Sequence, residues 1–132
     1  MPYEELQHTA DWCLRVWAAD LPSLFTEAAL GMNALSGARL APGPLLQRTF
    51  ECVAPDPESL LVSFLSELVF AAEQEQLAFG NFRIGIEGQS LKVQMDGAPL
   101  LSIHKTIKAV TYHNLQIRQT GRGFEVEIVF DV

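Results

Sequence analysis

The stretch DPESLLVSFLSELVFAAEQE, residues 56–75, decides the fold, because it carries the clearest helix signal in the chain. Asp56 can cap the first turn with its carboxylate, Pro57 is tolerated at the first helical position, and Glu58 lies at the positive end of the helix dipole. Apolar side chains then recur at helical spacing, namely Leu60, Leu61, Phe64, Leu65, Leu68, Val69 and Ala72. We therefore expect a helix that reaches about Glu75 and forms the centre of the core.

Upstream, the chain predicts two strands and another helix. Residues 3–8 and 12–19 have the alternation and the aromatic and β-branched content of strands, and residues 9–11 form a predicted turn between them. Asp20 can cap a helix that runs to about Ser36. Its apolar face comprises Leu21, Leu24, Phe25, Ala28 and Met32.

The remaining segments predict β-structure. The expected strands comprise residues 46–54, 82–88, 90–97, 106–119 and 124–132. Gly and Pro interrupt residues 37–45, which predicts a loop, whereas Asp96-Gly97 is a turn signal and residues 120–123 predict a hairpin turn. The expected order is β-β-α-β-α-β-β-β-β, which is an α+β fold of mostly antiparallel sheet with two helices packed on it.

Length and composition indicate one domain over residues 1–132, since 48% hydrophobic content can supply a core. No stretch approaches the roughly 20 apolar residues of a membrane helix, and the polar, acidic N-terminus is unlike a signal peptide. Cys13 and Cys52 match no metal-binding spacing, so we expect two reduced, buried thiols in a cytoplasmic protein. The net charge of −7 argues against direct binding of nucleic acid, which depends on Lys and Arg.

Sequence motifs of a self-contained enzyme are absent: there is no P-loop, Rossmann glycine pattern, HExxH, CxxC or GxSxG. His8, His104 and His113 are scattered along the chain, and such histidines more often make structural hydrogen bonds than bind zinc. Glu67 projects at the border of the apolar stripe of the helix in residues 56–75, so we expect a boundary carboxylate rather than a buried one.

The last strand, FEVEIVFDV, ends in two negative groups that lie one residue apart: the side chain of Asp131 and the α-carboxylate of Val132. Like charges at this distance repel each other. One interpretation is that Asp131 points into water at a frayed end, where the repulsion is screened. The other is a divalent-cation site, because Ca²⁺ and Mg²⁺ take oxygen ligands. Spacing alone does not choose between them.

Several short motifs resemble those of the archease family. They are LQHTAD at residues 6–11, SELVF at 66–70, KAVTYHNL at 108–115 and the terminal FDV at 130–132, in the same order as in the family. The stretch LPSLFTEAALGM at residues 21–32 is similar to the first helix of that family. The resemblance covers essentially the whole chain.

This resemblance implies a small cytoplasmic accessory protein rather than an enzyme. Archeases partner the RtcB-type RNA-splicing ligase, which joins tRNA exons or repaired RNA ends. By this resemblance the chain would help the ligase become guanylylated with GTP and turn over repeatedly, would meet tRNA or other RNA only through the ligase, and would not act at a membrane.

The resemblance also implies a metal site and an activating lysine. Asp11, Asp131 and Val132 would surround one divalent cation, with Ca²⁺ seen in the family and Mg²⁺ or Mn²⁺ as alternatives. Lys108 would serve ligase activation, and His8, Glu67 and His113 are candidate supporting residues.

Two other functions stay open. A general chaperone or modulator of nucleic-acid-processing enzymes would stimulate several unrelated RNA enzymes. A small metal-dependent hydrolase would turn over substrate as the purified protein alone, although the absence of a nucleophile motif weighs against it.

Overall fold

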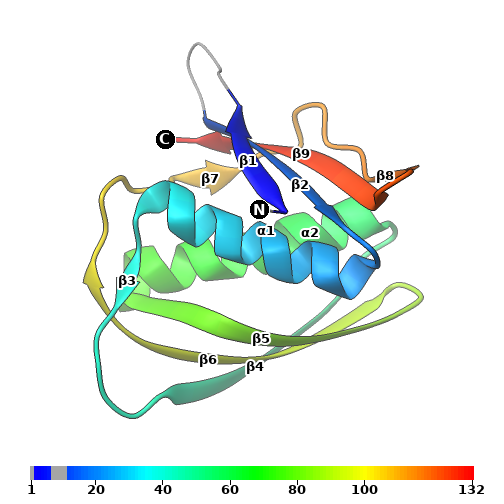
Figure 1. The fold of residues 1–132 in the computed structure, drawn as a ribbon. Coiled ribbons are helices and arrows are strands. Elements are labelled where there is room, and N and C mark those ends of the chain that lie inside the picture. The colour runs from blue at the N-terminus through cyan, green and yellow to red at the C-terminus, as the bar shows by residue number, and fades with distance from the viewer. Residues whose placement is uncertain (1, 7–11) are drawn as a thin grey trace.

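Helix α2 (Pro57–Phe70) lies at the centre of the computed structural model, which describes residues 2–6 and 12–132. The Asp56 carboxylate caps this helix by accepting the Ser59 N–H at 2.7 Å, as expected. The predicted continuation to Glu75 is confirmed, but the last turn, η1 (Ala71–Glu75), is π-helical. Sheets lie above and below α2 (Figure 1), which explains why its apolar stripe is so broad.

The helices are sandwiched between two antiparallel sheets (Figure 1). In the upper sheet the strand order is β1 (Tyr3–Leu6), β2 (Trp12–Ala18), β9 (Gly123–Asp131) and β7 (Ala109–Val110), and β8 (Arg118–Thr120) also pairs with β9. In the lower sheet β6 (Ser90–Ser102) pairs with β5 (Leu77–Glu87), β4 (Leu46–Val53) and the short β3 (Arg39–Leu40). The predicted α+β class, with antiparallel sheets and two packed helices, is confirmed.

Helix α1 (Leu21–Ser36) begins and ends as its sequence predicts. The Asp20 carboxylate accepts the Ser23 N–H at 2.8 Å, and Gly37 closes the helix in the left-handed conformation, with φ of 70°. Within α1, Gly31 permits a close approach to the upper sheet, because a Cβ there would meet the side chains of Leu14 and Tyr3.

Aromatic packing joins the helices to the lower sheet. Phe25 of α1 stacks on Phe64 of α2 with ring centroids 6.3 Å apart. Phe64 in turn meets Phe82 of β5 edge to face, with centroids 5.6 Å apart. Since Phe25 and Phe64 are fully buried, this cluster is the centre of the core.

The predicted long strand over residues 106–119 is wrong. Only β7 and β8 form there, and residues 111–117 between them belong to no strand, although Thr111 still bonds to Val129 of β9. Asn114 adopts a left-handed φ of 51°, and the Leu115 N–H donates to the Tyr112 carbonyl at 3.1 Å. The Ile117 N–H donates to the Glu58 carboxylate at 2.8 Å instead of to a strand partner. Local and side-chain hydrogen bonds therefore replace the expected ladder.

The turn predicted at Asp96-Gly97 is also wrong, because both residues lie inside β6. The Asp96 carboxylate faces the next strand and accepts hydrogen bonds from Asn81 and Arg83. Gly97 lies at a bulge of β5, where a Cβ would meet the backbone of Ala78 and the ring of Phe79. The dipeptide thus permits a close strand approach rather than a reversal.

Two further segments show where local signals suffice. Residues 37–45 form the expected connection, although two of them pair with β6 as β3. The hairpin predicted at residues 120–123 is confirmed: Thr120 pairs with Gly123, and the Arg122 N–H donates to the Thr120 hydroxyl at 3.1 Å. Within the described part of the chain, no helix has the length and apolar character needed to cross a membrane.

Candidate functional site

The C-terminal end of β9 lies between two other strand ends of the upper sheet. On one side Trp12, at the start of β2, pairs with Phe130. On the other side Ala109 and Val110 of β7 pair with Asp131 and Phe130. Three chain segments that are distant in sequence therefore meet at this end, and the Asp131 side chain is exposed there.

Lys108 is held directly beside this strand end. Its backbone N–H donates to the Asp131 carbonyl at 2.8 Å. The Val129 carbonyl accepts from the Thr111 N–H at 3.0 Å and from the Thr111 hydroxyl at 2.9 Å. The Lys108 side chain is exposed. The structure thus brings together Lys108, Asp131 and Val132, although nothing in their sequence spacing predicts that Lys108 lies near the chain end.

Two of the predicted site residues, Asp11 and His8, lie outside the described residues. The segment that follows them is placed, because Trp12 is the next residue after Asp11 and pairs beside the end of β9. Among residues 2–6 and 12–132, no group of three or more His, Cys, Asp or Glu side chains could hold a metal ion. The ligand set implied by the resemblance therefore stays a prediction.

The other candidate supporting residues lie elsewhere. His113 is exposed in the connection between β7 and β8, and its Nε2 lies 3.3 Å from the Asn114 amide nitrogen. Glu67 is half-buried on α2, as expected of a boundary carboxylate. The pKa of Arg48 on β4 is raised mainly by its hydrogen bond to Glu75, and the charge of Glu67 is a lesser cause. Glu67 therefore lies within electrostatic range of the lower sheet.

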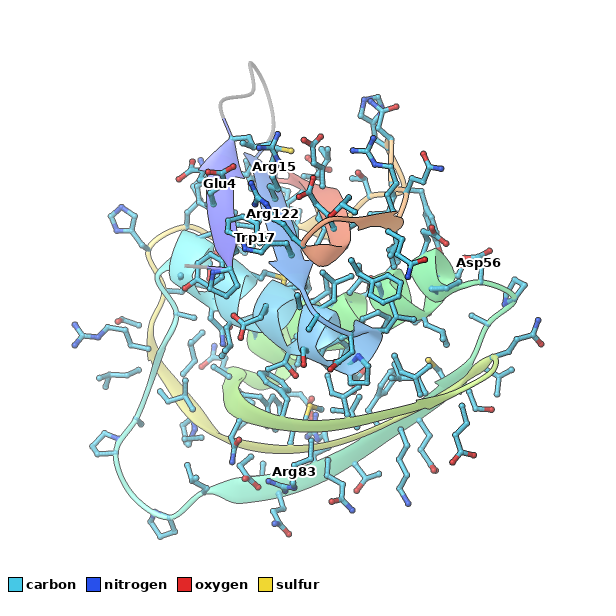
Figure 2. All side chains as sticks on the ribbon, turned by 45° about the vertical axis from the view of Figure 1, so that its right-hand side comes forward. Glu4, Arg15, Trp17, Asp56, Arg83 and Arg122 are labelled. Carbon is cyan, nitrogen blue, oxygen red and sulfur yellow. The ribbon has the colours of Figure 1, made fainter. Side chains whose placement is uncertain are left out.

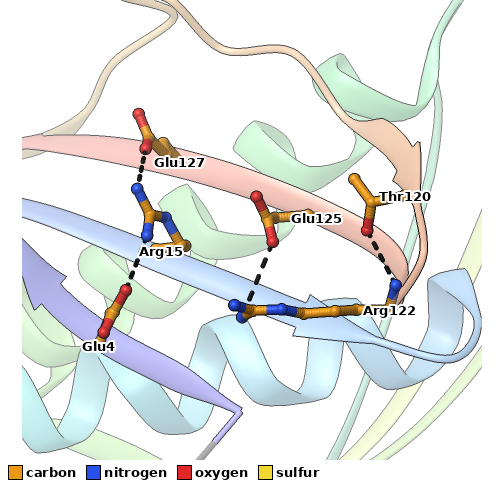
Figure 3. A network of polar contacts seen from close by, with 6 residues as sticks. All are labelled: Glu4, Arg15, Thr120, Arg122, Glu125 and Glu127. Carbon is orange, nitrogen blue, oxygen red and sulfur yellow. Dashed lines mark hydrogen bonds and ion pairs between the residues drawn. The ribbon is translucent and has the colours of Figure 1, made fainter.

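A network of charged side chains covers the outer face of the upper sheet (Figure 3). Arg15 joins Glu4 at 2.9 Å and Glu127 at 3.0 Å, and the hydrogen bond to Glu127 is the main cause of the raised pKa of Arg15. Figure 2 shows Glu4, Arg15, Trp17 and Arg122 on this face, and Arg83 on the far side of the lower sheet. The β2–β9 register places Arg15 opposite Glu127, and the local sequence carries no signal for this pairing.

The two cysteines are unsuited to nucleophilic chemistry. Burial, followed by the charge of Glu127, raises the pKa of the Cys13 thiol, and burial raises the pKa of the Cys52 thiol. Both are free, Cys13 is buried and Cys52 is half-buried. The expected burial is confirmed for Cys13, while Cys52 is less buried than expected, and the raised pKa values disfavour the thiolate form of both.

Comparison with known proteins agrees with this architecture. Residues 3–132 match the model of the Archease protein family (MTH1598/TM1083). The chain belongs to the archease family. It is 33% identical over 141 residues to Protein archease of Methanosarcina barkeri, with 98% of this chain and 95% of that protein covered. It is 31% identical to Protein archease of Methanopyrus kandleri, with both chains fully covered.

Solved structures support the archease fold. The solution structure of Protein 1598 from Methanobacterium thermoautotrophicum aligns with a TM-score of 0.72 at 22% identity, covering 99% of each chain. The crystal structure of an archease from Thermotoga maritima, described as a possible chaperone, also aligns with a TM-score of 0.72 at 22% identity, covering 98% of this chain and 96% of that one. An archease-type accessory role is therefore the coarse function that family membership supports.

Proposed function

We propose that this chain is an accessory protein of an RtcB-type RNA-splicing ligase, which it helps to become guanylylated with GTP and to turn over repeatedly in tRNA splicing or RNA repair. Membership of the archease family and the net charge of −7 support a role directed at a partner protein. In this proposal the ligase holds the RNA through its own basic surface, and the accessory chain acts on the ligase in the cytoplasm.

The observation that carries the proposal is the pairing of Lys108 with the end of β9. The 2.8 Å hydrogen bond from the Lys108 N–H to the Asp131 carbonyl joins the backbones of an exposed lysine and an exposed aspartate at one strand end. A cation and an anion carried on neighbouring strand ends can contact complementary groups of a nucleotidyl-transfer site. We propose that this end of the sheet faces the guanylylation site of the ligase.

The chemistry of this end also fits a hard divalent cation. Asp131 is exposed, and the α-carboxylate of Val132 would supply a second oxygen donor one residue later. With Asp11 as a third donor, the set would suit Ca²⁺, Mg²⁺ or Mn²⁺, which prefer oxygen ligands. Such a cation would remove the repulsion between neighbouring carboxylates. The cation would either be passed to the ligase or would hold the end of β9 in the arrangement that favours guanylylation.

The test is RNA ligation under multiple turnover with the cognate RtcB-type ligase, GTP and divalent metal. Wild type and Glu87→Ala, an exposed control on β5, should raise both ligation turnover and GMP loading. Asp131→Ala, Asp11→Ala and Lys108→Ala should fold normally and lose most of this stimulation.

Three results would contradict the proposal. Failure of wild type to stimulate would overturn the accessory role, and full stimulation by Asp131→Ala and Asp11→Ala would overturn the metal site. Equal stimulation of several unrelated RNA enzymes would favour the general chaperone function instead.

A further inference from the structure

A cavity of about 280 Å³ opens where the C-terminal ends of α1 and α2 meet the start of β5 and the end of β6, near β3 in Figure 1. Its apolar lining includes Met32, Leu68, Leu77, Phe79, Leu100 and Ile107. Cofactor and drug sites usually measure roughly 300–1,000 Å³, so this cavity is suited to one large side chain rather than to a whole cofactor.

Among the described residues that line the cavity, Glu73 is the one charged side chain. The Asn33 amide N–H already donates to the Phe79 carbonyl at 2.8 Å, and the Ser36 hydroxyl donates to the Asn33 carbonyl at 3.2 Å. The Asn33 amide keeps one N–H donor and its carbonyl oxygen, and the Ser36 hydroxyl keeps its acceptor lone pairs. Glu73 adds an exposed carboxylate at the rim, which forms no ion pair with another described residue. An apolar group with a neighbouring cation would match this arrangement.

Unusual backbone geometry builds the rim. Residues 71–75 form the π-helical turn η1, and Gln76 follows with a left-handed φ of 55°. The Gln76 N–H donates to the Ala71 carbonyl, and the Gln76 carbonyl accepts the Leu100 N–H at 2.7 Å. Non-glycine residues in this conformation and π-helical turns both concentrate at functional sites. Here they redirect the chain into β5 and place Glu73 and Gln76 at the cavity mouth.

One wall of the cavity belongs to a chain segment that leads directly into the candidate functional site. Ile103, Thr106 and Ile107 line it from the connection between β6 and β7. The Ser36 carbonyl at the end of α1 accepts the N–H groups of residues 104 and 105, at 2.8 Å and 3.0 Å, which fixes the connection in place. One residue beyond Ile107 lies Lys108, which pairs with the end of β9. A group bound in the cavity would therefore contact the segment that carries Lys108.

We propose that this cavity is a docking site for a segment of the partner protein that inserts one large apolar side chain next to an arginine or lysine. The inference rests on the proposed function, because an RNA-handling ligase must present basic residues to phosphates, and this chain, with net charge −7 and Glu73 at the rim, is complementary to them. The apolar side chain fills the cavity, and the basic residue pairs with Glu73.

The chemistry of the cavity is tested first without the ligase, by NMR titration with two probes that share an apolar body. In 4-phenylbutylamine the body carries an ammonium group, and in 4-phenylbutanoate it carries a carboxylate. The amine should shift the methyl resonances of Leu68, Leu77 and Ile107 and bind about fivefold more tightly than the acid. Glu73→Gln should remove this preference. Equal binding of both probes, or no binding of the amine, would overturn the proposal.

Docking is tested by measuring the affinity of the purified ligase for three variants whose helix content and melting temperature match wild type. Glu73→Lys and Glu87→Lys change the net charge equally, but only Glu73 lies at the cavity. Glu73→Lys and the cavity-filling Ala72→Phe should each weaken binding about tenfold, whereas Glu87→Lys should change it less than about twofold. Equal weakening by Glu73→Lys and Glu87→Lys, or wild-type affinity of both cavity variants, would overturn the docking site.

These measurements separate the two proposals. Asp131→Ala should bind the ligase with wild-type affinity while failing to stimulate it, because docking and activation use different residues. If the amine probe binds as expected but wild type shows no affinity for the ligase, the proposed function fails while the preference of the cavity for cationic apolar groups stands.

Discussion

The guanidinium carbon of Arg122 lies 4.4 Å from the centroid of the Trp17 ring, and the same group approaches the Glu125 carboxylate at 3.8 Å. The β8–β9 hairpin is thereby attached to the outer face of β2. A cation stacked on an indole at an exposed site contributes about 0.5–1 kcal/mol. This contact also covers one face of Trp17, which is only half-exposed.

Arg122→Ala should therefore lower the free energy of unfolding by about 1 kcal/mol and expose the Trp17 ring. In a Trp12→Phe background, where Trp17 alone emits, the native fluorescence should shift to longer wavelength. Lys92→Ala, at an exposed position of the lower sheet, should change neither quantity. Unchanged Trp17 emission in Arg122→Ala would contradict the stacked arrangement.

The cap of α2 gives a second prediction. Asp56→Ala removes the acceptor of the 2.7 Å hydrogen bond from Ser59 and should cost about 1 kcal/mol in urea unfolding. Asp56→Asn keeps an oxygen in the same position and should retain most of the stability. An equal loss in both variants would show that charge, rather than capping geometry, is the stabilising feature.

The core offers a matched pair of phenylalanines on one helix. Phe64 is fully buried between Phe25 and Phe82, so Phe64→Ala should cost about 3–5 kcal/mol. Phe70, six residues later, is 53% exposed, and Phe70→Ala should cost less than about 0.5 kcal/mol. If Phe64→Ala does not fold, Phe64→Leu should still unfold at a lower urea concentration than Phe70→Ala. Similar midpoints for the two positions would contradict the assigned core.

The hydrogen-bonded carboxylate of Asp96 should make the stability of the fold depend on pH. The pKa of Asp96 lies below its ordinary value mainly because Arg83 donates a hydrogen bond to the carboxylate. The hydrogen bond from the Asn81 amide contributes as well. A lowered pKa in the folded state means that the stabilisation is complete above the ordinary aspartate pKa of about 3.9. It is lost as the pH falls through the lower, folded-state value.

Asp96→Asn should therefore weaken the decrease of melting temperature in acid and lower the melting temperature at neutral pH. Glu51→Gln, an exposed carboxylate on neighbouring β4, should leave the acid profile unchanged. An identical acid profile for wild type and Asp96→Asn would show that the Arg83 pairing contributes nothing to folding.

The parts of the fold that follow from sequence are those with local causes. Asp20 and Asp56 correctly predict where the two helices begin. The alternation of the last strand correctly predicts its inward face, on which Ile128 and Phe130 are fully buried. The strand predicted over residues 106–119 does not form as one element, because the Ile117 N–H donates to the distant Glu58 carboxylate instead of to a neighbouring strand. Sequence alone contains no signal for a bond between segments so far apart.

In the candidate site, too, the sequence predicts individual residues but not the contacts between distant segments. The resemblance identified Asp131 and Lys108 separately, but their proximity depends on the pairing of β7 with β9, which only the three-dimensional structure reveals. The cavity at the ends of the helices had no sequence signal either, because residues from both helices and both long strands of the lower sheet converge on it. Tertiary pairing, rather than local propensity, creates both features.

The proposed role of the chain end in metal binding gives a last prediction. A two-residue extension after Val132 moves the α-carboxylate away from Asp131 and replaces it with a neutral peptide group, so one of the proposed oxygen donors is lost. Calcium affinity, measured by calorimetry, should fall at least tenfold, since charged ligands set the affinity of such sites. The melting temperature without metal should stay the same or rise slightly, because the extension also removes the repulsion between two neighbouring carboxylates. A matched two-residue extension at the N-terminus should leave the affinity unchanged. Unchanged calcium binding in the C-terminally extended chain would remove Val132 from the ligand set while leaving Asp131 and Asp11 to be tested by their own substitutions.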